Sequence, residues 1–264
     1  MDSLLSAIFS SEEKEQCVLD CMAYVMLLMA AFTFVALLSQ NVPYGRYSTG
    51  RGFPVNVKFA WFVQELPAFL LPVCLLLWTS SARTSLPANQ LLIAMYLCHY
   101  AQRSLIYPFF IRGGKPTPVV SFVLATMFCT YNGFMQIRYL SHYAHYPADW
   151  ITRPCFIAGC VLWCIGWLMN LHSDHILRTL RAPGESHYKI PQGGMFEYVS
   201  GANFLGEILE WAGFALAGQS VHSAAFAVFT AVVLRSRAVD HHRWYLDKFE
   251  DYPKTRKALI PFFY

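Results

Sequence analysis

Seven long apolar runs divide this sequence, and the segments between them hold most of its charged residues, glycines and prolines. Apolar side chains make up 56% of the 264 residues and charged ones only 14%, a balance that excludes an ordinary soluble domain. About 20 apolar residues in a helix cross the hydrocarbon core of a bilayer. We therefore predict a single integral membrane domain, 1–264, that is all-α and has seven transmembrane helices, at about 18–38, 59–78, 89–111, 118–137, 155–172, 195–217 and 221–234.

Positive charge is distributed unevenly between the alternate loops of this topology. With the N-terminus on the lumenal side, 15 Lys and Arg residues lie on the cytoplasmic side and 4 on the other, while Arg103 lies within a span. Cytoplasmic loops of membrane proteins carry the excess of Lys and Arg. The sequence thus predicts a lumenal N-terminus, a cytoplasmic C-terminus and a basic, aromatic, amphipathic tail over 235–264. No basic run is rich enough to indicate nucleic acid as a partner.

Polar side chains continue from one cytoplasmic loop into the apolar runs on both sides of it. Two series recur at steps of three or four, which places the members of each on one side of a helix: Asn170, Asp174, Arg178 and Arg181, and then Asn203, Glu207 and Glu210. A carboxylate in hydrocarbon costs on the order of 2.5 to 3.5 kcal/mol even on the lenient insertion scale, so these carboxylates must face protein, water or a ligand. Guanidinium groups suit bidentate contacts with phosphate. We interpret this region, with Lys115 and Lys189 from the cytoplasmic loops, as the site of an anionic cofactor.

Two other spans carry polar groups suited to carbonyl chemistry. Glu65 lies in the middle of the second run, near two prolines that loosen the backbone. A carboxyl group removed from water favours its protonated form, which can donate to a ketone; alternatively, Glu65 only bonds to another helix. Tyr100 can share a helical face with Arg103 and donate a phenolic proton toward a substrate oxygen. Alternatively, Arg103 only pairs with a carboxylate, for which Glu65, Glu207 and Glu210 are the candidates.

Common nucleotide motifs and metal-ligand spacings are not found in the sequence. No G-x-G-x-x-G follows a strand and no P-loop occurs, so helices would have to hold a dinucleotide. The nine histidines do not form the repeated boxes of membrane di-iron oxygenases, and we predict no metal site. His241 lies four residues before Tyr245 and can instead reach a cofactor from the tail.

Long, ordered segments of the chain resemble steroid 5α-reductase, formally 3-oxo-5-alpha-steroid 4-dehydrogenase. They are FVQELP, CHYAQR, RGGKP, FCTYNG, NLHSDHILRTLRAPGE, YKIPQGGMFEYVSGANFLGEILEW and HHRWYLDKFEDYPKTRKALIPF. RGGKP and RYLSH are more similar to the type 1 than to the type 2 isoform. The resemblance implies a multi-pass protein of the endoplasmic reticulum membrane, surrounded by lipid bilayer, that uses NADPH to saturate the carbon 4 to carbon 5 double bond of 3-keto steroids such as testosterone and progesterone. We expect a monomer.

The same resemblance assigns roles to individual residues. Glu65 and Tyr100 would hold the steroid 3-ketone, and Trp61 and Phe128 would line the steroid channel. The cofactor positions that it implies are Lys115, Asn170, Asp174, Arg181, Tyr188, Lys189, Asn203, Glu207, His241 and Tyr245. Donation to the ketone would draw electrons from the conjugated double bond and make carbon 5 a hydride acceptor. One departure from the family pattern is Gln102, where members usually have histidine.

Three other functions are compatible with the residues. The first is a related membrane reductase that acts on enoyl thioesters or polyprenals, which a substrate panel with NADPH would distinguish. The second is an isoprenylcysteine-type membrane methyltransferase, which would bind S-adenosylmethionine. The third is a non-catalytic sterol-binding membrane protein, which would bind steroid without oxidising NADPH.

Overall fold

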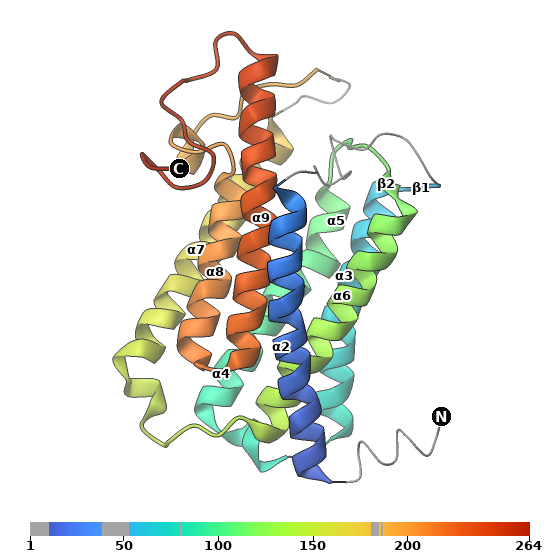
Figure 1. Cartoon of the computed structure of the whole chain (residues 1–264), viewed down its shortest axis with the longest axis vertical. Coiled ribbons are helices and arrows are strands. Elements are labelled where there is room, and N and C mark those ends of the chain that lie inside the picture. Colours follow the sequence, from blue (N-terminus) through green and yellow to red (C-terminus); the bar gives the residue numbers. More distant parts are fainter. Residues whose placement is uncertain (1–10, 39–52, 80, 181–184, 186) are drawn as a thin grey trace.

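Long helices dominate the computed structural model, which describes residues 11–38, 53–79, 81–180, 185 and 187–264 (Figure 1). The α-helices are α2 Glu12–Leu37, α3 Val57–Trp78, α4 Pro87–Ala101, α5 Tyr107–Phe110, α6 Val119–Arg138, α7 Pro154–Thr179, α8 Ala202–Gly218 and α9 Val221–Lys248. Two π-helical turns extend α4 and α6, namely η3 Gln102–Ile106 and η4 Tyr139–Tyr143. The short 3-10 turns are η2 Ala82–Ser85, η5 Trp150–Thr152 and η6 Gly194–Glu197. A two-residue strand, β1 Pro54–Val55, pairs antiparallel with β2 Thr117–Pro118.

The helices cover the predicted runs, but several bounds differ. Helix α2 begins at Glu12 and not near 18, α7 continues to Thr179 and not only to 172, and the last two runs differ as well. Among the described residues, four helical segments are long and apolar enough to cross a membrane: α2, α3, α6 with η4, and α7. The run predicted from about residue 195 becomes helical only at Ala202, because Gly193 and Gly194 adopt positive φ angles of 90° and 53° that no α-helix accommodates. The run predicted to end at 234 continues to Lys248, since neither glycine nor proline interrupts it. The first half of the predicted tail is therefore helical.

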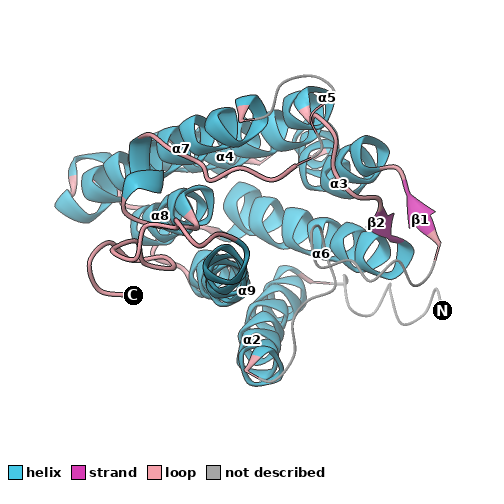
Figure 2. Ribbon diagram, turned by 90° about the horizontal axis from the view of Figure 1, so that it is seen from above, coloured by secondary structure: helices cyan, strands magenta, loops and turns pink. Residues whose placement is uncertain are grey.

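Helix α3 stays helical through its two internal prolines because α6 supports it along this stretch. Gly133 of α6 lies against the proline region, where an added Cβ would be 3.1 Å from the Cα of Ala68 and 3.4 Å from the carbonyl oxygen of Pro67. Figures 1 and 2 show the two helices side by side. The close contact holds the turn that carries Glu65 against α6.

Helices α7 and α8 pack backbone against backbone through glycines spaced seven residues apart. These are Gly159 and Gly166 on α7, and Gly206 and Gly213 on α8. An added Cβ on Gly166 would lie 2.2 Å from the backbone nitrogen of Glu210, and one on Gly206 would lie 2.5 Å from that of Asn170. Small residues permit this close approach between membrane helices. The polar series on the two helices are thereby held side by side.

The remaining helices complete a bundle around an aromatic core. Helix α9 packs on α8, and α2 packs along the outside of α9 (Figure 2). The core includes Tyr96, Tyr100, Trp211, Phe214 and Phe226. The end of α9, the segment before α8 and the β1–β2 pair lie at one end of the bundle, and the start of α2 lies at the other (Figure 1). This is the arrangement expected if the loops predicted to be cytoplasmic share one side.

Candidate functional site

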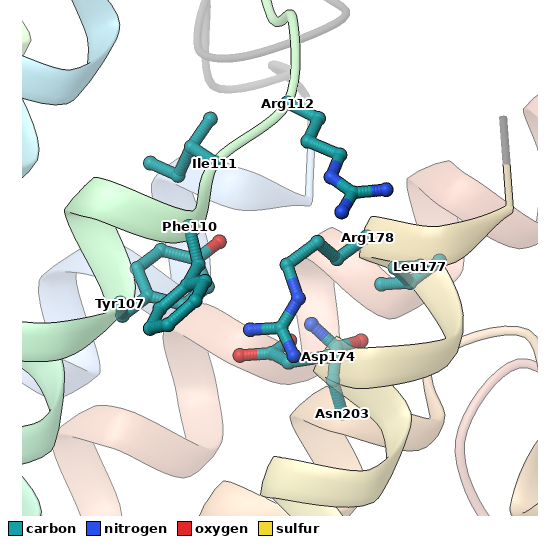
Figure 3. Close-up of a pocket in the computed structure, with 8 residues that line it drawn as sticks. All are labelled: Tyr107, Phe110, Ile111, Arg112, Asp174, Leu177, Arg178 and Asn203. Atoms are coloured by element: carbon teal, nitrogen blue, oxygen red, sulfur yellow. The ribbon is translucent and has the colours of Figure 1, made fainter. Parts of the chain in front are cut away.

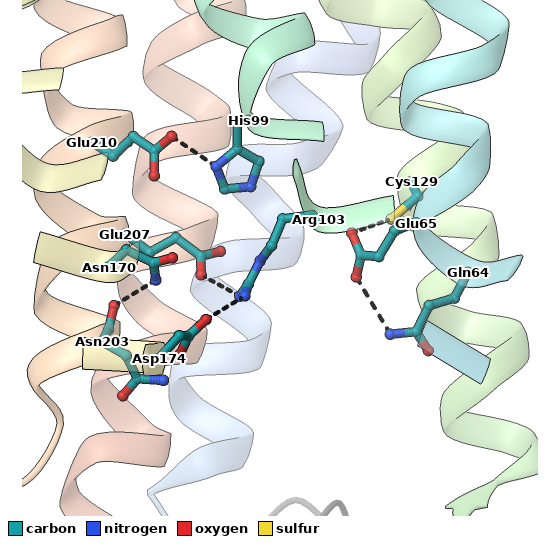
Figure 4. A network of polar contacts seen from close by, with 10 residues as sticks. All are labelled: Gln64, Glu65, His99, Arg103, Cys129, Asn170, Asp174, Asn203, Glu207 and Glu210. Carbon is teal, nitrogen blue, oxygen red and sulfur yellow. Dashed lines mark hydrogen bonds and ion pairs between the residues drawn. The ribbon is translucent and has the colours of Figure 1, made fainter. Parts of the chain in front are cut away.

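A buried arginine joins three helical segments at the centre of the site. Arg103 lies in the π-helical turn η3, a distortion often found at functional sites. Its Nη1 donates to Oδ2 of Asp174 at 3.0 Å, and its Nη2 donates to Oε2 of Glu207 at 2.8 Å (Figure 4). The rings of Trp61 and Tyr107 lie 5.4 and 4.8 Å from the guanidinium carbon. We call Arg103, Asp174 and Glu207 the Arg103 cluster. Of the three carboxylates considered as partners from the sequence, Glu207 makes the contact, and Asp174 is the second partner.

The two predicted asparagines meet beside this cluster. Nδ2 of Asn170 on α7 donates to the carbonyl oxygen of Asn203 on α8 at 2.9 Å, across the glycine-lined interface (Figure 4). Asn170 is almost fully buried, so its amide serves to fix the first turn of α8. The side chains of Asn203 and Asp174 lie next to one another (Figure 3). Both polar series predicted from the sequence therefore converge in space.

A pocket of about 150 Å³ opens next to Asp174 and Asn203. Its lining consists of Tyr107, Phe110, Ile111, Arg112, Asp174, Leu177, Arg178 and Asn203 (Figure 3). In Figure 3 the guanidinium group of Arg178 lies beside Asp174, and that of Arg112 lies above it. The lining of the pocket thus combines two cations with a carboxylate and an amide. This donor set suits a ligand with both phosphate and hydroxyl or amide groups.

Glu65 and Tyr100 face the same stretch of α6 from two different helices. Oε2 of Glu65 accepts from Sγ of Cys129 at 3.6 Å, and Oε1 accepts from Nε2 of the neighbouring Gln64 at 3.3 Å. The Tyr100 hydroxyl accepts from Nδ2 of Asn132, one turn after Cys129, at 3.5 Å. Figure 4 shows Glu65 on the opposite side of Arg103 from Asp174 and Glu207. The two contacts from amide nitrogens are long and the thiol is a weak donor, so both groups can still make a further hydrogen bond.

A second buried pair lies one turn from Arg103. Nδ1 of His99 is 2.7 Å from Oε1 of Glu210, with 3% and 0% of the two side chains exposed (Figure 4). The ring of His99 also packs edge-on against that of Tyr100, with 5.0 Å between centroids. Both residues were visible as polar groups in apolar runs, but nothing in their spacing connects them. The pair satisfies one oxygen of the buried Glu210 carboxyl, while the other, Oε2, is buried without a hydrogen-bond partner among the described residues.

Three residues of α6 that the sequence reasoning passed over also belong to this region: Cys129, Asn132 and Gln136. They recur at steps of three and four within a long apolar run. Polar residues at such steps identified the polar faces of the fifth and sixth runs, and the same rule would have identified these three residues in the fourth run.

The predicted steroid-channel residues lie on both sides of Glu65. Trp61, one turn before Glu65 on α3, packs edge-on against Tyr107 with 5.0 Å between centroids. Phe128, adjacent to Cys129 on α6, stacks on Phe229 of α9 at 4.7 Å. The surroundings of Glu65 are thus strongly aromatic.

The other predicted cofactor residues that the structure describes lie at the end of the bundle and beyond it, not in the Arg103 cluster. Tyr188 packs edge-on against Trp244 at 4.8 Å, and Tyr245 stacks on Tyr252 at 5.1 Å. Lys189 forms an ion pair with Glu185 at 2.5 Å, and Lys115 is exposed in the loop before β2. Arg181 lies outside the described residues. We call the segment 187–200 and the chain from His241 onward the cap.

The cap is connected to the cluster through α8. The ring of His241 lies 5.2 Å from that of Phe204, the residue that follows Asn203. Oγ of Ser200, just before α8, is 2.7 Å from both Nδ1 of His242 and the hydroxyl of Tyr252. Burial, together with the nearby charge of Lys257, lowers the pKa of His242 and favours its neutral form. Among the described residues, no group of three or more His, Cys, Asp and Glu side chains is placed to hold a metal ion.

Fold and site together define a helical membrane protein with a buried ionic cluster beside a basic pocket. Its family is identified by sequence: the chain belongs to the 3-oxo-5-alpha-steroid 4-dehydrogenases, whose family model matches residues 115–264. It is 53% identical over 252 residues to 3-oxo-5-alpha-steroid 4-dehydrogenase 1 of Rattus norvegicus, covering 95% of this chain and 97% of that one. The human type 1 enzyme is 50% identical over 251 residues, covering 95% and 97%.

The type 2 enzyme of Rattus norvegicus is less similar, with 47% identity over 235 residues that cover 88% of this chain and 92% of that one. The predicted family and the predicted similarity to type 1 are therefore confirmed. This assignment excludes the methyltransferase and the non-catalytic sterol-binding alternatives.

Proposed function

We propose that this protein is an NADPH-dependent reductase of the carbon 4 to carbon 5 double bond in 3-oxo-4-ene steroids such as testosterone and progesterone, with 5α-reduced products. The observation that carries the proposal is the position of Glu65 and Tyr100. They face one stretch of α6, accept only weak or long hydrogen bonds from it and from Gln64, and lie beside the Arg103 cluster. Two buried proton donors in aromatic surroundings are suited to polarise a ketone. Membership of the 3-oxo-5-alpha-steroid 4-dehydrogenase family supports this choice of substrate.

We further propose seven transmembrane helices in the endoplasmic reticulum membrane, with a lumenal N-terminus, a cytoplasmic C-terminus and a monomeric state. The uneven distribution of Lys and Arg supports this orientation. Helices α4, α8 and α9 are shorter or more polar than the four most apolar ones, but much of their surface is covered by other helices. The two carboxylates of α8, Glu207 and Glu210, therefore face protein, as a bilayer requires. The unit 1–264 is taken as a single membrane domain.

The pocket residues fit the chemistry of NADPH. Guanidinium groups of Arg112 and Arg178 match phosphates, while the carboxylate of Asp174 and the amide of Asn203 match hydroxyl and amide groups. We assign cofactor binding to Lys115, Asn170, Asp174, Arg181, Tyr188, Lys189, Asn203, Glu207, His241 and Tyr245. When bound, NADPH supplies a hydride to the steroid. The pocket at the membrane end lets a soluble nucleotide enter from the cytosol, whereas steroid can enter from the bilayer.

The side chains of the site then make carbon 5 reactive. Protonated Glu65 and Tyr100 donate to the 3-ketone oxygen and stabilise the negative charge that develops on it. Electron density moves from the double bond toward the oxygen, carbon 5 accepts the hydride, and carbon 4 takes a proton. Trp61 and Phe128 pack beside the steroid and exclude water from the reacting atoms. The overall reaction consumes one NADPH and one proton for each double bond.

Product analysis tests this function directly. Purified protein in lipid nanodiscs receives testosterone with NADPH, and mass spectrometry with authentic standards identifies the dihydro product and its configuration at carbon 5. We expect the 5α product and one NADPH oxidised for each molecule formed. Parallel reactions with an enoyl thioester and a polyprenal test the related reductase function. Turnover of either of these without any steroid reduction would contradict the proposal.

A further inference from the structure

A chain of buried amides connects Tyr100 to the start of α9. Nδ2 of Asn132 donates to the hydroxyl of Tyr96 at 3.3 Å and to that of Tyr100 at 3.5 Å. Oδ1 of Asn132 accepts from Nε2 of Gln136 at 3.2 Å, and the same Nε2 donates to the carbonyl oxygen of His222 at 2.8 Å. Asn132 and Gln136 are 0% and 1% exposed. Water is therefore not at hand to replace any of these bonds.

The direction of this chain is fixed at its far end. The carbonyl oxygen of His222 can only accept, so Gln136 must turn its amide nitrogen, and not its oxygen, toward it. That nitrogen also faces Asn132, which must then present its oxygen to Gln136. The nitrogen of Asn132 is left to face the two tyrosines. Each amide orientation thus follows from the previous one, beginning at a backbone atom that has no alternative.

We propose that Asn132 is a positioning residue that makes Tyr100 a hydrogen-bond donor toward the substrate ketone, with Gln136 holding Asn132 in that orientation. Because Asn132 presents a donor, the Tyr100 oxygen accepts from it, and the phenolic hydrogen is left for an acceptor other than Asn132, which is the neighbouring Tyr96 hydroxyl or, when substrate binds, its ketone. An acceptor at this position would bind that hydrogen and turn it away from substrate. Donation from Asn132 also stabilises the negative charge that builds on the phenol oxygen as its proton moves toward the ketone. The inference rests on the proposed function, because it assumes that Tyr100 acts on a ketone.

A double-mutant cycle separates this role from simple packing. Leucine has nearly the volume of asparagine, so Asn132→Leu removes the donor and leaves Gln136 its bond to His222. We expect kcat to fall roughly tenfold, as for the loss of one buried hydrogen bond, with the KM for NADPH unchanged. In the Tyr100→Phe background, Asn132→Leu should cause no further loss, because the hydroxyl that it orients is gone. An equal loss in both backgrounds, or no loss in either, would overturn the proposal.

Gln136→Leu provides a second test, which can be carried out even if the Asn132→Leu protein does not fold. It frees the Asn132 amide to rotate, so we expect a smaller fall in kcat that also disappears in the Tyr100→Phe background. A fall that persists there would contradict the orientation chain. Asn89→Leu is the matched control, since Asn89 is an equally buried amide that bonds only to the carbonyl oxygens of Leu140 and Ala144. It should lower thermal stability and leave kcat per folded molecule unchanged.

Failure of the proposed function gives a different pattern. If the wild-type protein reduces no steroid, the proposed function is wrong and there is no kcat from which to measure the double-mutant cycle. If the wild-type protein is active and Tyr100→Phe is impaired, while Asn132→Leu and Gln136→Leu turn over normally, only the inference about the amide chain is wrong.

Discussion

The Arg103 cluster and the Glu65–Tyr100 region lie next to each other but satisfy their polar groups in opposite ways. In the first, one guanidinium donates to two carboxylates at 2.8 and 3.0 Å, a geometry typical of strong charge-assisted bonds. In the second, the contacts of the carboxyl and the phenol measure 3.3 to 3.6 Å and involve a thiol and amides. The difference separates two tasks. The cluster joins helices, and its Asp174 lines the pocket, whereas under the proposed function Glu65 and Tyr100 use their remaining hydrogen-bonding capacity to bind a substrate.

The largest effect should come from removing the cation of the cluster. Arg103→Leu leaves Asp174 and Glu207 as uncompensated buried carboxylates, which costs on the order of 3–5 kcal/mol. We expect a much lower melting temperature or no folded protein, measured by thermal unfolding and size-exclusion chromatography in detergent. Arg103→Lys, which keeps the charge but not the two-pronged geometry, should be less damaging. A leucine variant as stable as the wild type would show that the cluster does not hold the bundle together.

Tyr100→Phe should affect catalysis and leave folding intact. Loss of a proton donor to the ketone typically lowers the rate by about 10² to 10⁴-fold. We expect such a fall in kcat for testosterone, with melting temperature and NADPH affinity close to those of the wild type, measured by steady-state kinetics and cofactor titration. Normal turnover in this variant would refute the assignment of Tyr100.

Gly166→Ala tests how the two polar series are brought together. The new Cβ would overlap the backbone of Glu210, so α7 and α8 must separate, at a typical cost of about 1–3 kcal/mol. Because this also parts Asn170 from Asn203, NADPH affinity should fall along with the melting temperature. Ile165→Ala, which changes an exposed side chain in the same turn, is the control. Unchanged NADPH affinity in Gly166→Ala would mean that the helix contact does not set the site.

The smallest effect is expected on stability and comes from the cap, which lies outside both the Arg103 cluster and the Glu65–Tyr100 region. Because burial and Lys257 lower the pKa of His242 from its ordinary value of 6.5, the unfolded chain binds a proton there more readily than the folded one. This contribution to stability is present above pH 6.5 and is lost as the pH falls from there toward the lower folded pKa. We therefore expect the melting temperature to fall as the pH is lowered below 6.5, and to fall less in His242→Gln than in the wild type. Identical pH profiles for both proteins would argue against it.

The sequence predicted most of the helices and the polar faces because both depend on local spacing. Apolar runs of membrane length and steps of three or four residues placed Asn170, Asp174, Asn203 and Glu207 correctly on helices that meet. The choice of partner was beyond this reasoning, since it depends on how helices rotate and approach one another. Arg103 pairs with Asp174 and Glu207, and His99 takes Glu210.

The sequence did not predict the late start of α8 or the glycine contacts between α7 and α8, and the reasons are related. Gly193 and Gly194 signal a turn, yet the apolar residues around them continue a run that looks helical. The seven-residue spacing of Gly159 and Gly166 is visible in the sequence, but its meaning depends on a partner helix with glycines at matching heights. Local patterns thus predict elements and faces, while contacts between elements need the structure.

Single-turnover kinetics of Glu65→Gln tests the division of tasks most directly. The variant keeps the shape of the side chain and removes the acidic proton, so with NADPH bound in advance only the chemical step is observed after steroid is added. We predict wild-type NADPH affinity and a rate of double-bond reduction lower by about 10²-fold or more. A wild-type rate, or a slower rate fully explained by lost NADPH affinity, would contradict the account.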